Sequence, residues 1–231
     1  MLEIIQNYWP MFLVGQYPNG PLGGLALTLI LAACGLLLSF PLAIGLALAR
    51  VGPCKWLSTA SRLIVNVVRG VPLLMLIFWA YFVIPKLTGE SISGFWTLIW
   101  ALVVYESAYL SEVIRAGIEA IPKGQIEASN SLGAGYWTTV RKVILPQALF
   151  NVLPGMTSQF VSTIKETSLG YVISVNELTF AANQVNNLVL TQPLQVFGIL
   201  AIIYFIVCFS LSRTVNWVER RIQRSRQMAV I

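Results

Sequence analysis

Two residue types are missing from this chain of 231 residues: it contains no histidine and no aspartate. Histidine is the commonest general base and metal ligand, so its absence argues against His-dependent hydrolysis and against His-ligated metal sites. The cysteines Cys34, Cys54 and Cys208 are scattered and form no CxxC pair. They read as small hydrophobic residues within helices, and we expect no metal site.

Charge is also scarce. Only 10% of the residues are charged and 57% are hydrophobic, against about 25% charged in ordinary soluble domains. Such a chain cannot cover itself with polar surface and needs an apolar solvent. We therefore expect an all-α integral membrane protein with one transmembrane domain over residues 1–231.

Five stretches are apolar and long enough to cross a bilayer, which requires about 20 residues. In the first, Gly35, Ser39, Ala43 and Ala47 recur every fourth residue, which predicts close packing against a neighbouring helix. The five expected spans cover residues 22–49, 63–85, 95–116, 146–170 and 194–218.

Lysine and arginine are distributed unevenly between the connections. They cluster around the first connection, in the third (residues 117–145) and at the C-terminus, whereas the first 49 residues have none. The positive-inside rule then predicts an outside N-terminus and a cytoplasmic C-terminus. The basic pI of 9.4 fits this topology and contact with anionic lipid rather than nucleic-acid binding.

The third span carries charges at or near membrane depth. Glu112, Arg115 and Glu119 are spaced i, i+3, i+7 on one helical face, where they can partly neutralise one another as a structural anchor. Glu106 lies deeper and off that face, by roughly 120° of helix rotation. An acidic group there is costly unless it is paired or hydrated. Glu106 is a candidate for lining a polar path, with a buried structural hydrogen bond as the alternative.

A second polar group interrupts the fourth span. Lys165 and Glu166 are followed by Thr167, Ser168 and then Gly170. A charge pair before a helix break can place charges and backbone groups at a polar solute. An interfacial helix end with a self-compensating pair is the alternative. The amide-rich stretch 176–193 suits either docking of a soluble partner or a re-entrant segment.

The chain also lacks a GxxxxGK[ST] phosphate loop, so it does not bind ATP in that manner. It shows no apparent pair of inverted halves of the kind many secondary transporters contain. Five spans in one small chain make a poor complete transporter. A partner chain is therefore expected.

The polar connection 117–145 carries a recognisable pattern: Glu127-Ala128-Ser129, Gly133 after three residues, then Ile144-Leu145-Pro146. It resembles the EAA loop of binding-protein-dependent ABC importer permeases, with serine for the second alanine and no residue between Ile144 and Leu145. The segments 67–85, 105–129 and 165–174 also resemble the polar amino-acid permeases of this superfamily, in the family's order.

The resemblance implies the ABC type I importer permease fold, with five transmembrane helices and a cytoplasmic coupling helix. It also implies a bacterial inner-membrane assembly of two permease subunits, identical or paralogous, two ATP-binding cassette subunits and an extracytoplasmic amino-acid-binding protein. ATP and Mg would bind the separate ATPase, so no cofactor is expected in this chain and it is not itself an enzyme.

The coupling helix would sit in a groove of the ATPase. Gly133 offers a helix C-cap, Tyr136 and Trp137 offer apolar anchors, and Arg141 can pair with acidic groups on the ATPase or with lipid phosphate. The residues expected to couple this chain to the ATPase are Glu127, Ala128, Ser129, Gly133, Tyr136, Trp137, Arg141, Leu145 and Pro146.

The function predicted from these features is ATP-driven import of polar L-amino acids by alternating access, with a lean to glutamate, glutamine or aspartate. One alternative keeps the architecture with another cargo, such as basic amino acids or opines. Another is an ATP-independent small channel or scaffold subunit.

Overall fold

The computed structural model describes residues 1–90 and 92–228, without the side chains at 154, 157, 218, 219 and 221–228. Within that part of the chain the structure is helical and has no β-strand, which confirms the predicted all-α fold. The elements, in chain order, are α1 (Leu2–Val14), α2 (Gly24–Val51), α3 (Lys55–Gly70), α4 (Leu73–Phe78), the π-helix η1 (Trp79–Val83), α5 (Ile84–Thr88), α6 (Gly94–Glu119), α7 (Lys123–Ser131), α8 (Tyr136–Thr139), the π-helix η2 (Val140–Ile144), α9 (Leu145–Asn151), α10 (Leu153–Glu166), the 3₁₀-helix η3 (Thr167–Ile173), α11 (Leu178–Val189) and α12 (Pro193–Met228).

Within residues 1–90 and 92–228, three helices are long and apolar enough to cross a membrane: α2, α6 and α12 over residues Pro193–Trp217. The small residues of α2 face inward, with Ser39, Ala43 and Ala47 fully buried. A Cβ added at Gly35 would lie 3.3 Å from Cβ of Leu102 in α6. The small-residue spacing thus lets α2 and α6 pack closely, as the sequence predicts.

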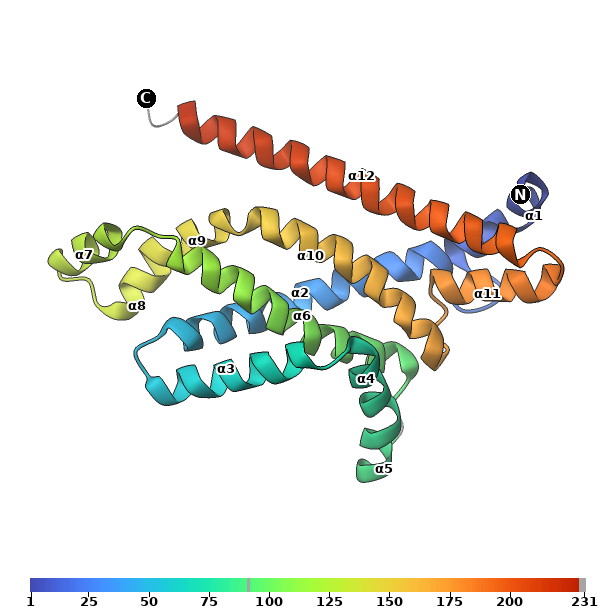
Figure 1. The fold of residues 1–231 in the computed structure, drawn as a ribbon, viewed down its shortest axis with the longest axis horizontal. Helices are drawn as coiled ribbons and strands as arrows, with labels where there is room; N and C mark the ends of the chain where they lie inside the picture. Colours follow the sequence, from blue (N-terminus) through green and yellow to red (C-terminus); the bar gives the residue numbers. More distant parts are fainter. Residues whose placement is uncertain (91, 229–231) are drawn as a thin grey trace.

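The expected second span, 63–85, does not form one straight helix. It is divided between α3 and the α4–η1–α5 segment, which meet at a bend of 98°. The bend follows Gly70, and Val71 precedes Pro72, a position where helical backbone is disfavoured. In Figure 1, α4 and α5 project away from the rest of the bundle.

The expected fourth span, 146–170, is likewise divided among α9, α10 and η3. The helix is interrupted at Val152, between α9 and α10. Pro154 lies in the first turn of α10, where proline is tolerated because the N–H group that it lacks would have no helical partner. By length and composition the described residues contain three spans, or four if the bent α3–α5 pair crosses as one. The count of five stays a prediction.

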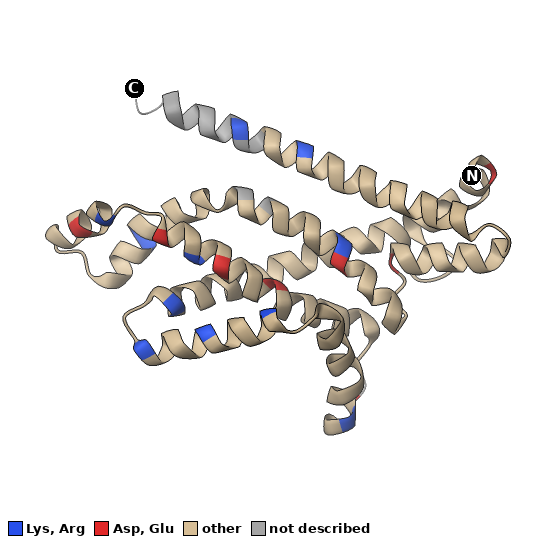
Figure 2. Cartoon of the chain, in the orientation of Figure 1, with Lys and Arg blue, Asp and Glu red and all other residues tan. Residues whose placement is uncertain are grey.

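The bundle has two distinct ends. Figure 1 shows α7 and α8 at one end and α1 and α11 at the other, with α2, α6 and α10 running between them. Figure 2 shows that most described Lys and Arg residues gather in the half that carries α3, α7 and α8. Buried apolar clusters lie at both ends, one around Ile114 and Val140 near α7 and α8 and one around Leu178 and Val196 near α1 and α11, and a further cluster around Leu31 and Leu102 joins α2 to α6.

Candidate coupling and substrate sites

The EAA-like pattern folds into a compact helical turn. α7 ends at Ser131, and Gly133 adopts a left-handed φ of 76° that L side chains rarely adopt. Its N–H donates to the carbonyl of Asn130 at 2.9 Å. The glycine therefore ends α7 and reverses the chain into α8.

A buried hydrogen bond joins the two helices of this segment. The hydroxyl oxygens of Ser129 in α7 and Thr139 in α8 lie 2.9 Å apart, and both residues are buried. Ser129 is the residue that departs from the alanine of the EAA pattern. Its hydroxyl is used inside the segment, so the departure fastens α7 to α8.

Large apolar side chains on the segment remain uncovered. Leu132 is 88% exposed and Trp137 is 71% exposed. The Tyr136 ring lies 5.3 Å from the Trp137 ring, edge to face, and its hydroxyl approaches Gly52 at the α2–α3 corner. Exposed aromatic side chains on a rigid element are typical anchors of a protein interface.

The remaining residues of the pattern are spread over its surface. Glu127, Ala128, Arg141 and Pro146 are exposed, whereas Leu145 is half-buried. Pro146 lies in the first turn of α9. We define the coupling segment as residues 123–146.

A polar cluster lies in the middle of the bundle. Glu106 of α6 is fully buried and accepts hydrogen bonds from Gln159 Nε2 at 2.7 Å and Thr163 Oγ1 at 2.6 Å, both on α10. The carboxyl group of Glu166, also on α10, lies close enough to the Glu106 carboxyl group for the two to interact. Its Oε2 atom is buried and has no hydrogen-bond partner among the described residues.

The neighbours of Glu166 point elsewhere. Lys165 is exposed and lies near Cys208 of α12, so it does not pair with the Glu106 carboxylate. The Thr167 and Ser168 hydroxyls donate to backbone carbonyls three residues earlier, at the end of α10: Ile164 at 2.8 Å and Lys165 at 2.6 Å. Of the residues proposed from the sequence to line a path, the structure brings Glu106 and Glu166 together.

Gln159 was not predicted from the sequence, and Thr163 was noted only as a polar residue flanking Lys165 and Glu166. They recur with Glu166 at i, i+4 and i+7, so all three share one face of α10. This polar stripe within an apolar helix is the signal that could have identified them.

The charged stripe of α6 takes part in a wider ion-pair network. Arg115 pairs with Glu112 at 2.9 Å and with Glu119 at 2.5 Å. Glu112 also pairs with Arg50 at the end of α2 and lies 3.9 Å from Arg69 of α3. The network ties α2, α3 and α6 together near the coupling segment. The spacing of residues along α6 could not predict that Arg50 and Arg69 contact Glu112, because both arginines are far from Glu112 in the sequence.

A second buried carboxylate lies at the opposite end of the bundle. Glu177 caps α11 by accepting from the backbone N–H groups of Thr179 at 2.8 Å and Phe180 at 2.9 Å, and it accepts from the Tyr204 hydroxyl of α12 at 3.2 Å. Burial raises the pKa of the Glu177 carboxyl to about 7, although the backbone and hydroxyl donors act in the opposite direction. Glu177 therefore holds α11 against α12.

Long apolar helices, a polar cluster between them and a glycine-turned segment with exposed anchors define the class of protein: a transmembrane transport subunit. The family model described as "Binding-protein-dependent transport system inner membrane component" matches residues 39–224. The chain belongs to this family.

Curated relatives point to the amino-acid permeases within it. The chain is 35% identical over 223 residues to the inner membrane amino-acid ABC transporter permease protein YhdY of Escherichia coli K12, covering 95% of this chain but only 61% of YhdY. It is 35% identical over 217 residues to the probable glutamine ABC transporter permease protein GlnP of Bacillus subtilis 168, covering 91% of this chain and 99% of GlnP.

A solved structure has the same fold as this chain. The crystal structure of an amino acid ABC transporter with histidines contains a chain 30% identical to this one. The two superpose with a TM-score of 0.83, over 95% of this chain and 97% of the other. The chain is therefore similar to an amino-acid ABC permease in sequence and throughout its fold.

Proposed function

We propose that this chain is the membrane-spanning subunit of an ATP-driven importer of polar L-amino acids, and that the coupling segment is where the force of ATP hydrolysis enters. The observation that carries the proposal is the coupling segment itself: two short helices fastened by the buried Ser129–Thr139 hydrogen bond, with Leu132 and Trp137 left uncovered. A rigid element with uncovered anchors can transmit a push or pull when it is seated in a partner's groove.

The proposed assembly contains two permease subunits, identical or paralogous, and two ATP-binding cassette subunits that bind ATP and Mg. A binding protein delivers the solute on the outer side. The coupling segment faces the cytoplasm and the N-terminus faces outward, in keeping with the gathering of Lys and Arg near α3, α7 and α8.

Transport proceeds by alternating access. Closure of the ATPase dimer draws the two coupling segments together and opens the permease pair outward. Release after hydrolysis returns the pair to the inward-open state. The Glu112 network passes this motion to the spans, because it joins the ends of α2 and α6 beside the coupling segment.

The solute contacts the cluster around Glu106. Two carboxylates, Glu106 and Glu166, lie together there, and neither forms an ion pair with a described cation. The buried Oε2 atom of Glu166 lacks a donor, and unpaired buried carboxylates are costly. The α-ammonium group that every amino acid carries would supply both charge and donors. The proposed cargo is glutamine, glutamate or aspartate, and basic amino acids and opines are the alternatives.

The test is a Gly133→Asp variant in the complete transporter, reconstituted with its ATPase and binding protein. Any L residue is strained at a φ of 76°, at a cost of about 1 kcal/mol, and aspartate also adds charge to the docking surface. We expect solute-stimulated ATP hydrolysis and uptake to fall at least about tenfold, while the protein stays inserted in the membrane.

Gly89→Asp is the matched control. Gly89 has a similar φ of 78° and equally open surroundings, but it ends α5, outside the coupling segment. Its variant should transport normally. Wild-type uptake by Gly133→Asp at wild-type expression, or an equal loss in both variants, would contradict the proposal.

A further inference from the structure

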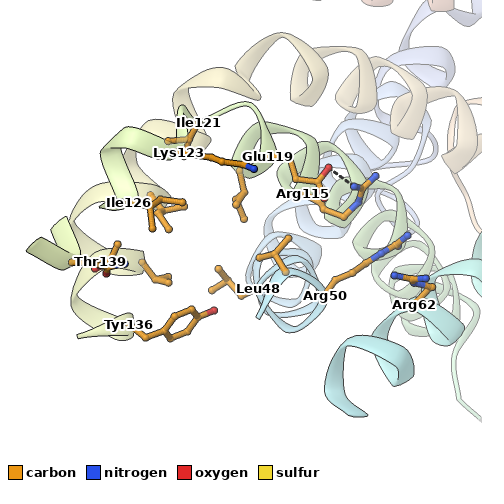
Figure 3. Close-up of a pocket in the computed structure, with 15 residues that line it drawn as sticks. Leu48, Arg50, Arg62, Arg115, Glu119, Ile121, Lys123, Ile126, Tyr136 and Thr139 are labelled. Atoms are coloured by element: carbon orange, nitrogen blue, oxygen red, sulfur yellow. Dashed lines mark hydrogen bonds and ion pairs between the residues drawn. The ribbon is translucent and has the colours of Figure 1, made fainter. Parts of the chain in front are cut away.

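A cavity of about 760 Å³ lies behind the coupling segment. Figure 3 shows it enclosed by α7 and α8 on one side, by the end of α6 above, and by the α2–α3 corner on the other side. Its walls include the apolar side chains of Leu48, Ile118, Ile126 and Val140. Residues of the coupling segment, Tyr136 among them, form one side of the cavity, whereas the exposed anchors Leu132 and Trp137 are not among its lining residues.

The polar part of the lining is strongly basic. It contains four cations, Arg50, Arg62, Arg115 and Lys123, and a single carboxylate, Glu119. Arg115 forms an ion pair with Glu119, and Arg50 forms one with Glu112, which does not line the cavity. Four cations against those two carboxylates leave two positive charges.

Those two charges belong to Arg62 and Lys123. Both are exposed, and neither forms an ion pair within the described part of the chain. Arg62 belongs to α3 and Lys123 to α7, on opposite sides of the cavity in the view of Figure 3. An anion in the cavity would meet positive charge from both sides.

The level of the cavity in the membrane indicates what kind of anion fits. It lies where α2 and α6 end, at Val51 and Glu119, and where α3 begins, at Lys55. Span ends lie at headgroup depth, and the cytoplasmic leaflet carries the anionic lipids. Basic pockets between helices at that level bind anionic headgroups, and the apolar walls match the glycerol and upper acyl region of a lipid.

We propose that this cavity binds one anionic phospholipid, with its phosphate attracted by the unpaired charges of Arg62 and Lys123 and its apolar part against Leu48 and Ile126. The cytoplasmic placement of the cavity rests on the proposed function. The bound lipid bridges the α2–α3 corner and the inner side of the coupling segment. The same phosphate chemistry could come from a soluble anion, which the experiment below distinguishes.

The complete transporter, purified with its ATPase, is placed in bilayer discs of phosphatidylcholine with phosphatidylglycerol, and retained lipid is counted by native mass spectrometry. Wild type should retain phosphatidylglycerol, and an Arg62→Gln/Lys123→Gln variant should bind it about thirtyfold more weakly. The control, Lys55→Gln/Arg213→Gln, removes two exposed cations outside the cavity lining and should bind within about threefold of wild type.

Two further arms identify the occupant. Excess inorganic phosphate should neither displace the lipid nor be retained in phosphatidylcholine discs alone. Displacement by phosphate, equal retention by the Arg62/Lys123 variant and wild type, or cross-linking of an Asn130→Cys variant to another protein chain through the cavity would each overturn the lipid proposal.

Solute-stimulated ATP hydrolysis is measured on the same samples. Normal coupling without lipid retention would remove only the lipid inference. Lipid retention without any coupling to the ATPase would instead remove the proposed function.

Discussion

The hydroxyl groups of Ser129 and Thr139 lie 2.9 Å apart and are buried between α7 and α8. Ser129 stands where the EAA pattern has alanine, so a residue that looks like a small departure holds the coupling segment together. In the proposed mechanism, coupling depends on the rigidity of that segment.

Ser129→Ala restores the alanine of the pattern, yet we expect it to loosen the segment. It leaves the buried Thr139 hydroxyl without its partner, at a cost of about 1–2 kcal/mol. Hydrogen exchange over residues 123–145 should become faster. Adding Thr139→Val should recover most of the protection, because removing both polar partners is nearly neutral. Unchanged exchange in the single variant would show that the bond contributes nothing.

Glu106→Gln tests the substrate cluster. Glutamine removes the charge but keeps one acceptor oxygen for the Thr163 hydroxyl, and the Gln159 amide can turn its own oxygen toward the new NH2 group, so purely structural hydrogen bonding would survive. If an ammonium group binds here, the KM for uptake should rise about 10- to 100-fold. Glu90→Gln, at an exposed residue outside the bundle core, is the control. A KM within twofold of wild type for Glu106→Gln would refute ammonium binding.

The two carboxylates of the α6 stripe should differ in their contribution to stability. Glu112 is 16% exposed and contacts Arg50 and Arg115, whereas Glu119 is 54% exposed and pairs with Arg115 alone. Glu112→Gln should lower stability by about 1–3 kcal/mol, and Glu119→Gln by less than about 1 kcal/mol because solvent screens that pair. Thermal unfolding of the two solubilised variants compares them directly. Equal decreases in unfolding temperature for the two variants would contradict the larger role of Glu112 in the ion-pair network.

Glu177 should make stability depend on pH. Its pKa is raised from 4.5 to about 7 in the folded protein, so between those values the folded state binds more protons than the unfolded state. The free energy of unfolding should therefore fall as pH rises from about 4.5 to 7, and should level off above that range. In Glu177→Gln this contribution disappears. Thermal unfolding measured at pH 5 and pH 8 should show that stability falls more between these pH values in wild type than in the variant. Equal losses of stability would contradict a contribution from Glu177.

The sequence predicted those features that depend on local composition. Long apolar runs identified α2, α6 and α12, and the residue spacing placed Glu112, Arg115 and Glu119 on one face. Gly133 marked the end of α7, because a left-handed turn strongly favours glycine.

Most features that depend on long-range contacts or backbone breaks were not predicted. The run 63–85 is predominantly apolar, and hydropathy does not register the 98° bend after Gly70. The charge pair at Lys165 and Glu166 indicated a break in the fourth span, where α10 passes into η3 at Thr167, but the earlier interruption at Val152 was not predicted. The partners of Glu106 and the Tyr204 hydroxyl that contacts Glu177 come from other helices, and single-sequence periodicity does not report which helices meet.

The most direct measurement of the central claim is photo-cross-linking from Trp137, which is 71% exposed on the coupling segment. A photoreactive phenylalanine analogue replaces Trp137 in the complete transporter, and another replaces Leu190, which is 78% exposed at the opposite end of the bundle. We predict that position 137 cross-links to the ATP-binding subunit in an ATP-dependent manner and that position 190 does not. Absence of that cross-link at position 137 in a transporter that still imports solute would contradict the claim that force enters there.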